Sequence, residues 1–163
     1  MKHWGIVVCY TLLTYLSLPF ARTWQRFFRE RLGSDFSLSI NLFILAAGLL
    51  TVLWVFRKAA KAAFWLAVAL LILLLALAAQ MNIPEERIHL LQYGILGYFI
   101  ARAIRPNLSL MVHLGVATLI GTLIGLGDEM IQWVLPNRFF DWRDVGTNLT
   151  GVAFGAAIFH ILK

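Results

Sequence analysis

The sequence predicts an all-α fold, a polytopic transmembrane helical bundle of about six (five to six) membrane spans plus one interfacial amphipathic helix. Of its 163 residues, 61% are hydrophobic and 13% are charged, and the mean hydropathy is +0.80. Soluble proteins carry about 25% charged residues. The apolar runs are long enough to cross a bilayer, which takes about 20 residues per helix. With no repeat and no linker in the chain, we expect one integral membrane domain over residues 1–163.

The predicted membrane spans follow from the apolar runs and from the residues that interrupt them. Six spans are predicted, at Trp4–Ala21, Leu38–Phe56, Ala63–Met81, Ile88–Ile104, Leu108–Leu126 and Val145–Leu162. Pro84 and Pro106 bracket the fourth span, because proline disfavours helix propagation. Asn107 or Ser109 is expected to cap the fifth. The count falls to five if the first or last span is only partly inserted.

A separate amphipathic segment lies between the first two spans. Its apolar residues recur at i, i+3, i+4 and i+8, which places Trp24, Phe27, Phe28 and Leu32 on one face. Arginines and one glutamate occupy the other side. This pattern is typical of a helix lying in the headgroup plane of a membrane.

The net charge of +6 does not indicate a nucleic-acid partner, because the basic residues stand in short segments between apolar spans. Charges placed there orient a membrane protein and contact anionic lipids. With six spans, seven Lys and Arg residues lie on the side of the termini and seven on the opposite side. If Arg87, Arg138 and Arg143 serve a site, the opposite side keeps only four, against seven on the side of the termini. We therefore expect both termini inside the cell and the polar site facing outward.

Polar residues gather at the ends of the last three spans, on what must be one membrane face. Glu85, His89 and Tyr93 share a helical face at i, i+4 and i+8. The stretch GDEMIQWVLPNRFFDWRDVGTN supplies the rest: Asp128, Glu129, Gln132, Arg138, Asp141, Arg143, Asp144 and Asn148. Ionisable groups at membrane depth cost about 2.5–3.5 kcal/mol each on insertion scales. Turning these faces toward one another is the least costly arrangement, so we expect a polar pocket between spans four, five and six.

Several of these residues also have simpler explanations. Asp141 can be a helix N-cap, with Asp144 stabilising the first turn of that helix. Arg143 can contact lipid phosphates, and Glu86 is expected to be solvated. The glycine pairs Gly121/Gly125 and Gly151/Gly155 have the spacing that permits close helix packing.

Two motifs, ERIHLLQYGILGY and DEMIQWVLPNRFFDWRDVGTNLTGVAFG, resemble the VanZ-like family of bacterial membrane proteins, which includes the teicoplanin-resistance protein VanZ. The matching positions are His89, Tyr93, Asp128, Glu129, Gln132, Pro136, Arg138, Asp141, Asp144, Val145, Asn148, Gly151 and Gly155. The turn glycine of the family is Asn137 here, and Gln92 stands where relatives often have Glu. The motifs lie within about residues 83–155. The resemblance implies a multi-pass protein of the bacterial cytoplasmic (inner) membrane, linked to the cell envelope and to glycopeptide resistance, and leaves the reaction open.

Three functions remain open from the sequence. An intramembrane enzyme acting on a lipid or lipid-linked envelope substrate would use the catalytic residues His89, Glu129, Asp128 and Asp144. Its substrate-binding residues would be Arg87, Tyr93, Gln132, Arg138, Asp141 and Asn148. The alternatives are a non-catalytic binder or translocator of a lipid or amphiphilic glycopeptide, and a structural ion-pair network without ligand. We expect no cofactor, with a divalent metal held by Asp and Glu oxygens as a variant of the enzyme.

Overall fold

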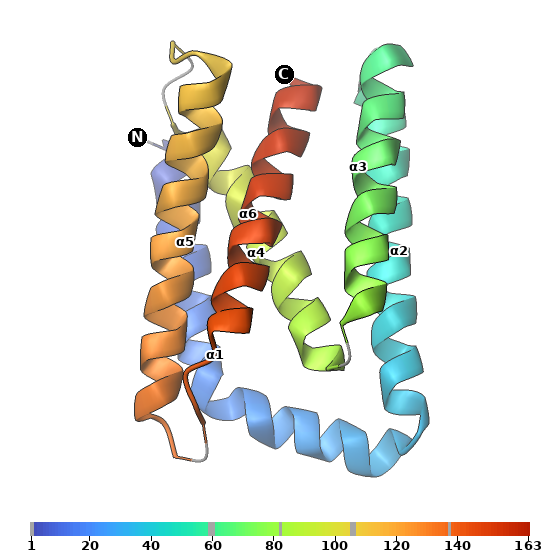
Figure 1. The fold of residues 1–163 in the computed structure, drawn as a ribbon, viewed down its shortest axis with the longest axis vertical. Coiled ribbons are helices and arrows are strands. Elements are labelled where there is room, and N and C mark those ends of the chain that lie inside the picture. Colours follow the sequence, from blue (N-terminus) through green and yellow to red (C-terminus); the bar gives the residue numbers. More distant parts are fainter. Residues whose placement is uncertain (1, 59–60, 82, 105–106, 137) are drawn as a thin grey trace.

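The computed structural model describes residues 2–58, 61–81, 83–104, 107–136 and 138–163. Within these ranges the chain forms six α-helices and no strand (Figure 1). The helices are α1 (Lys2–Leu32), α2 (Asp35–Lys58), α3 (Lys61–Gln80), α4 (Pro84–Ala103), α5 (Leu110–Val134) and α6 (Trp142–Leu162). The predicted all-α fold is confirmed.

Five helices in these ranges are long and apolar enough to cross a membrane, namely α1, α2, α3, α5 and α6. The sixth, α4, carries Glu86, Arg87 and His89 in its first turns, which makes it more polar than the others. Large apolar side chains such as Leu16 and Phe56 are 67% exposed. Five such helices with apolar side chains on their outer surface make the chain a multi-pass membrane protein.

Helix α1 turns sharply part-way along its length. Its first part runs alongside α5, and its second part lies across one end of the bundle (Figure 1). Pro19 lies inside the helix, where it removes one backbone hydrogen bond and permits a kink. Beyond the bend, Trp24, Phe27 and Phe28 are exposed and pack on one another with ring centroids 5.5–6.3 Å apart. This second part is the amphipathic segment that the sequence predicts.

The core of the molecule is the contact between α4 and α6, and it depends on glycines. A Cβ added at Gly155 would overlap the carbonyl oxygen of Gly94, and one at Gly97 would overlap that of Val152. At Gly121, on α5, an added Cβ would lie 2.5 Å from Val152. The expected close packing at the glycine pairs is therefore confirmed, and it brings the backbones of α4 and α6 together, with α5 packed on the side chains of α6.

Among the helix boundaries that differ from the expectation, those of α5 and α4 affect the site. Helix α5 continues two turns beyond Leu126, to Val134, because Met130, Ile131 and Trp133 extend its apolar surface. Helix α4 begins at Pro84, with proline in its first turn, where a missing N–H costs nothing. The acidic residues of α5 and the histidine of α4 thus stand on rigid helices. They do not lie in loops.

Candidate functional site

The polar residues of α4 and α5 come together at the end of the bundle where α1 bends. We call His89, Tyr93, Asp128, Glu129 and Gln132 the polar cluster. Asp128 and Glu129 are 0% exposed and Gln132 is 3% exposed. Their spacing along α5 places all three on its inner face, against α4 and α6.

Asp128 is the centre of the polar cluster. Its Oδ2 accepts a hydrogen bond of 2.9 Å from the Tyr93 hydroxyl and lies 4.0 Å from His89 Nδ1. The rings of His89 and Tyr93 are stacked, with an interplanar angle of 6°. One helical turn separates the two residues, so α4 presents a hydroxyl and an imidazole to the same carboxylate.

Glu129 connects the polar cluster to the segment that precedes α6. Its Oε1 accepts a 2.9 Å bond from Gln132 Nε2, and its Oε2 accepts a 3.2 Å bond from the backbone N–H of Asp141. The Asp141 side chain accepts from Arg143 N at 2.8 Å, so the predicted N-cap of α6 is confirmed. Asp141 therefore caps a helix with its side chain and holds Glu129 with its backbone.

Arg138 reaches the polar cluster through an amide. Its Nη1 donates to Gln132 Oε1 at 2.6 Å, and its Nη2 lies 3.5 Å from the carbonyl oxygen of Leu18. Burial lowers the pKa of Arg138 from its ordinary value, yet a guanidinium keeps its charge in proteins. The turn before it closes with Arg138 N bonded to Leu135 O, and Asn137 lies outside the described residues.

Helix α6 contributes two polar side chains with unsatisfied atoms. Asn148 is 0% exposed, and neither its Oδ1 nor its Nδ2 has a hydrogen-bond partner in the part of the chain that is described. Oδ1 of Asp144, one turn earlier, is likewise buried without a partner there. Asn148 packs beside Gly125 and Tyr93, next to the polar cluster. Since buried polar groups normally have partners, these atoms are where a ligand or water would be expected to bind.

Arg87, also predicted as a site residue, lies apart from the polar cluster. Its Nε and Nη2 donate to Met81 O at 3.2 and 2.5 Å, and its Nη1 donates to Asn41 Oδ1 on α2. Glu86 is buried, at 6% exposure, and pairs with Arg143 over 3.1 Å. The expectation of a solvated Glu86 was wrong, because α4 turns this residue toward α6. The side chain of Glu85 lies outside the described residues.

Sequence reasoning missed the part that α1 plays. The Tyr15 hydroxyl donates to Ile124 O at 2.6 Å, and Gln92 Nε2 donates to Thr14 Oγ1 at 3.0 Å. The Tyr10 hydroxyl donates to Gln92 O at 3.0 Å. The signal was present as hydroxyl groups recurring at i and i+4 within an apolar span, which is typical of a helix that bonds to its neighbours.

Three side chains of the polar cluster could hold a metal ion. One ligand atom each from His89, Asp128 and Glu129 lie within 4.8 Å of one another. A mixed set of one imidazole and two carboxylates suits a divalent first-row metal that keeps further positions open. The same set can equally exchange protons without a metal.

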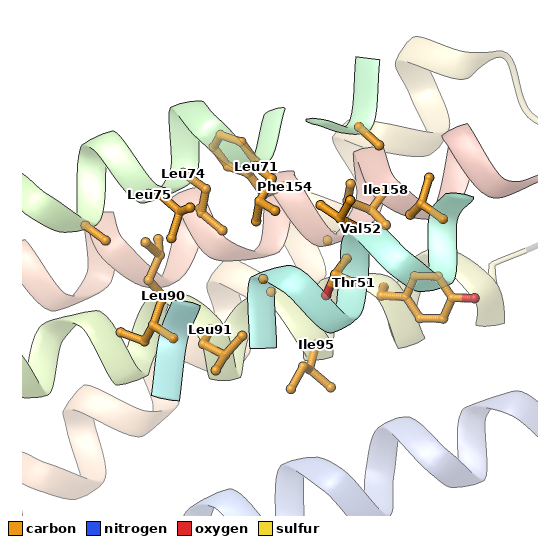
Figure 2. Close-up of a pocket in the computed structure, with 18 of the residues that line it drawn as sticks. Thr51, Val52, Leu71, Leu74, Leu75, Leu90, Leu91, Ile95, Phe154 and Ile158 are labelled. Atoms are coloured by element: carbon orange, nitrogen blue, oxygen red, sulfur yellow. The ribbon is translucent and has the colours of Figure 1, made fainter. Parts of the chain in front are cut away.

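A cavity of about 260 Å³ lies on the other side of the α4–α6 pair, between these helices and the hairpin of α2 and α3. Figure 2 shows its apolar lining, with Leu74 and Leu75 of α3 pointing toward Leu90 of α4. Arg87 belongs to its wall. The α4–α6 contact separates this cavity from the polar cluster.

The arrangement of the last three helices can be compared with known proteins. A family model described as VanZ/LLP1 matches residues 6–163. The chain belongs to this family. The match extends from the motif-bearing helices back to the first residues of α1, so the N-terminal helices of this VanZ/LLP1 member are part of the family pattern. No curated protein and no solved structure matches the chain.

Proposed function

We propose that this VanZ/LLP1 protein is an intramembrane enzyme of the bacterial cell envelope that performs acid–base chemistry on a lipid or lipid-linked substrate. The observation that carries the proposal is the close approach of His89, Asp128 and Glu129, whose ligand atoms lie within 4.8 Å of one another. A fully buried carboxylate pair costs free energy when no cation is paired with it. Buried ionisable groups that lower the stability of a protein are typical of binding and catalytic sites.

The roles follow from the contacts. His89 and Glu129 are the proton-transferring pair, because imidazole and carboxylate are the usual general acids and bases. Asp128 faces the imidazole, with 4.0 Å between its Oδ2 and His89 Nδ1, so a proton can pass between the two groups through one bridging water. Tyr93 holds Asp128 in place through its 2.9 Å bond. With no serine or cysteine in this group, activation of water is favoured over a covalent intermediate.

Substrate binding is assigned to the neighbours of the polar cluster. Arg138 has guanidinium N–H groups beyond the two used for Gln132 and Leu18, and these suit a phosphate or carboxylate. Asn148 has its amide free within the described chain, so it can orient a substrate or stabilise an oxyanion. The expected substrate is therefore an amphiphile with an anionic group near the membrane surface.

Replacing one carboxylate by its amide tests the proposal. Glu129→Gln keeps the size of the side chain and removes its proton transfer. We expect cells that express the wild-type protein to show a changed lipid composition by mass spectrometry, and cells that express Glu129→Gln to match cells without the protein. Glu30→Gln is the control, because Glu30 is exposed on the amphipathic part of α1.

The binder alternative has a different outcome in the same experiment. A binder would leave the composition unchanged and would carry the same amphiphile through purification with and without Glu129→Gln. Equal lipid compositions in wild-type and Glu129→Gln cells, at equal amounts of protein in the membrane, would contradict the enzyme.

A further inference from the structure

We infer that the cavity between the α2–α3 hairpin and the α4–α6 pair holds one hydrocarbon chain of a membrane lipid, whose anionic headgroup binds Arg87. This site is separate from the polar cluster and involves different atoms. The inference can therefore be tested independently of the proposed enzyme activity.

The first argument is the lining. The cavity of about 260 Å³ is walled by leucine, isoleucine, valine, alanine and aromatic side chains from four helices. An apolar cavity of about 150 Å³ already binds benzene, so this one has room for a longer chain. On α4 the wall runs from Arg87 to Tyr98, which at 1.5 Å per residue is about 16 Å. That is about half of the 30 Å hydrocarbon core, the depth of one leaflet.

The second argument is the charge at one end of the cavity. Arg87 is half-buried, and its partners Met81 O and Asn41 Oδ1 are neutral. No carboxylate pairs with it in the described part of the chain. A guanidinium has five N–H donors, of which three are used here, so two remain for a further acceptor. A phosphate at the membrane surface supplies both the charge and the acceptor oxygens.

These two features select the occupant. Water is a poor occupant of a cavity lined with leucine, and a soluble anion would leave the apolar walls empty. A peptide helix, about 10 Å across with its side chains, would need far more than 260 Å³ over the same length. A lipid chain with an anionic headgroup matches the lining, the depth and the cation together. It would also fill the space between the hairpin and the rest of the bundle, where backbone packing is less close than between α4 and α6.

A cavity-filling substitution on α3 tests the chain site. Leu74 lines the cavity (Figure 2), whereas its neighbour Leu73 is 50% exposed on the outer surface of the same helix. Delipidated protein in detergent would be incubated with phosphatidylglycerol and examined by native mass spectrometry. We expect the wild-type protein and Leu73→Trp to retain one lipid. In Leu74→Trp the lipid-bound fraction should be at least tenfold lower.

A charge substitution tests the headgroup. With equimolar phosphatidylglycerol and phosphatidylcholine of identical chains, we expect about a tenfold preference for the anionic lipid, the effect of one charge-assisted contact. Arg87→Gln should abolish the preference, and Arg87→Lys should retain most of it. Arg102→Gln is the control, since Arg102 is exposed at the other end of α4.

Gel filtration of every variant separates misfolding from loss of the lipid. Three results would overturn the inference: no retained lipid in the folded wild-type protein, equal retention by Leu74→Trp and Leu73→Trp, or a preference for the anionic lipid that survives Arg87→Gln. None of these readouts depends on Glu129, so failure here is distinguishable from failure of the proposed enzyme.

Discussion

At the scale of single residues, the main feature is a pair of buried carboxylates, Asp128 and Glu129, to which no Lys or Arg of the described chain forms a direct salt bridge. The guanidinium of Arg138 contacts the polar cluster through the amide of Gln132, and no hydrogen bond joins it to Asp128 or Glu129 in the described chain. In the described chain, the only basic side chain within 4.0 Å of Asp128 is that of His89. A structural ion-pair network would place the guanidinium on the carboxylates, so this arrangement favours a functional site.

A neutral isostere should therefore stabilise the protein. Asp128→Asn keeps an acceptor for the Tyr93 hydroxyl and removes one buried charge. We expect a gain of about 1 kcal/mol, which raises Tm by roughly 2–4 °C for a chain of this size. The measurement is thermal unfolding of the purified protein in detergent. A clear fall in Tm would instead support the structural ion-pair network.

The residues of the polar cluster could be predicted from their spacing. The position of Arg87 could not be predicted from its closeness to His89 in the sequence. His89 and Tyr93 are four residues apart and share a face, as do Asp128 and Gln132. Arg87 and His89 are two residues apart, about 200° around the helix, so they point in opposite directions. The helical period thus separates Arg87 from His89, although both lie at the same end of α4.

At the scale of helices, the contact between α4 and α6 fixes the position of the site. Because an added Cβ at Gly151 would lie 2.5 Å from Leu90 O, and others would overlap carbonyl oxygens, the two backbones meet without side chains between them. Small-residue spacing predicted that a close contact exists. The glycine spacing by itself could not say which backbone lies opposite, since that depends on packing in three dimensions.

One methyl group at this contact should be costly. In Gly155→Ala the new Cβ overlaps the carbonyl oxygen of Gly94, so the helices must move apart. We expect a loss of about 1–3 kcal/mol, as for overpacked cores. The matched control is Gly146→Ala on the same helix, where nothing lies within 4 Å of the added Cβ. Denaturant unfolding in detergent should show the control unchanged or slightly more stable.

Equal stability of the two alanine variants would contradict the backbone contact. If only Gly155→Ala loses stability, the displacement of α4 from α6 should also disturb the polar cluster. Tyr93 stands on α4, and its neighbour Asn148 stands on α6.

At the scale of the whole molecule, the order of the helices places all elements of the polar cluster at one end. The beginning of α4, the end of α5 and the beginning of α6 lie together at the end where the second part of α1 crosses the bundle (Figure 1). The chain ends lie toward the opposite end (Figure 1). The apolar pattern of the sequence predicted this arrangement, because an even number of passes returns the chain to its starting side. It did not predict the hydroxyl contacts of α1, which exist only once the helices are packed.

The side of the membrane that this end faces can be measured directly. We expect it to face outward, because seven Lys and Arg residues lie at the end that carries the chain termini, against five at this end once Arg138 and Arg143 beside the site are set aside. The test uses a Cys9→Ala background with Ser34→Cys or Asn107→Cys. Ser34 lies in the turn between α1 and α2, which is at the end of the bundle that carries the polar cluster, and Asn107 lies in the segment between α4 and α5, which is at the other end (Figure 1). A membrane-impermeant maleimide added to intact cells should label Ser34→Cys and spare Asn107→Cys. A permeant maleimide should label both. The reverse pattern with the impermeant reagent would place the polar cluster toward the cytoplasm, and its substrate would then have to come from the inner leaflet.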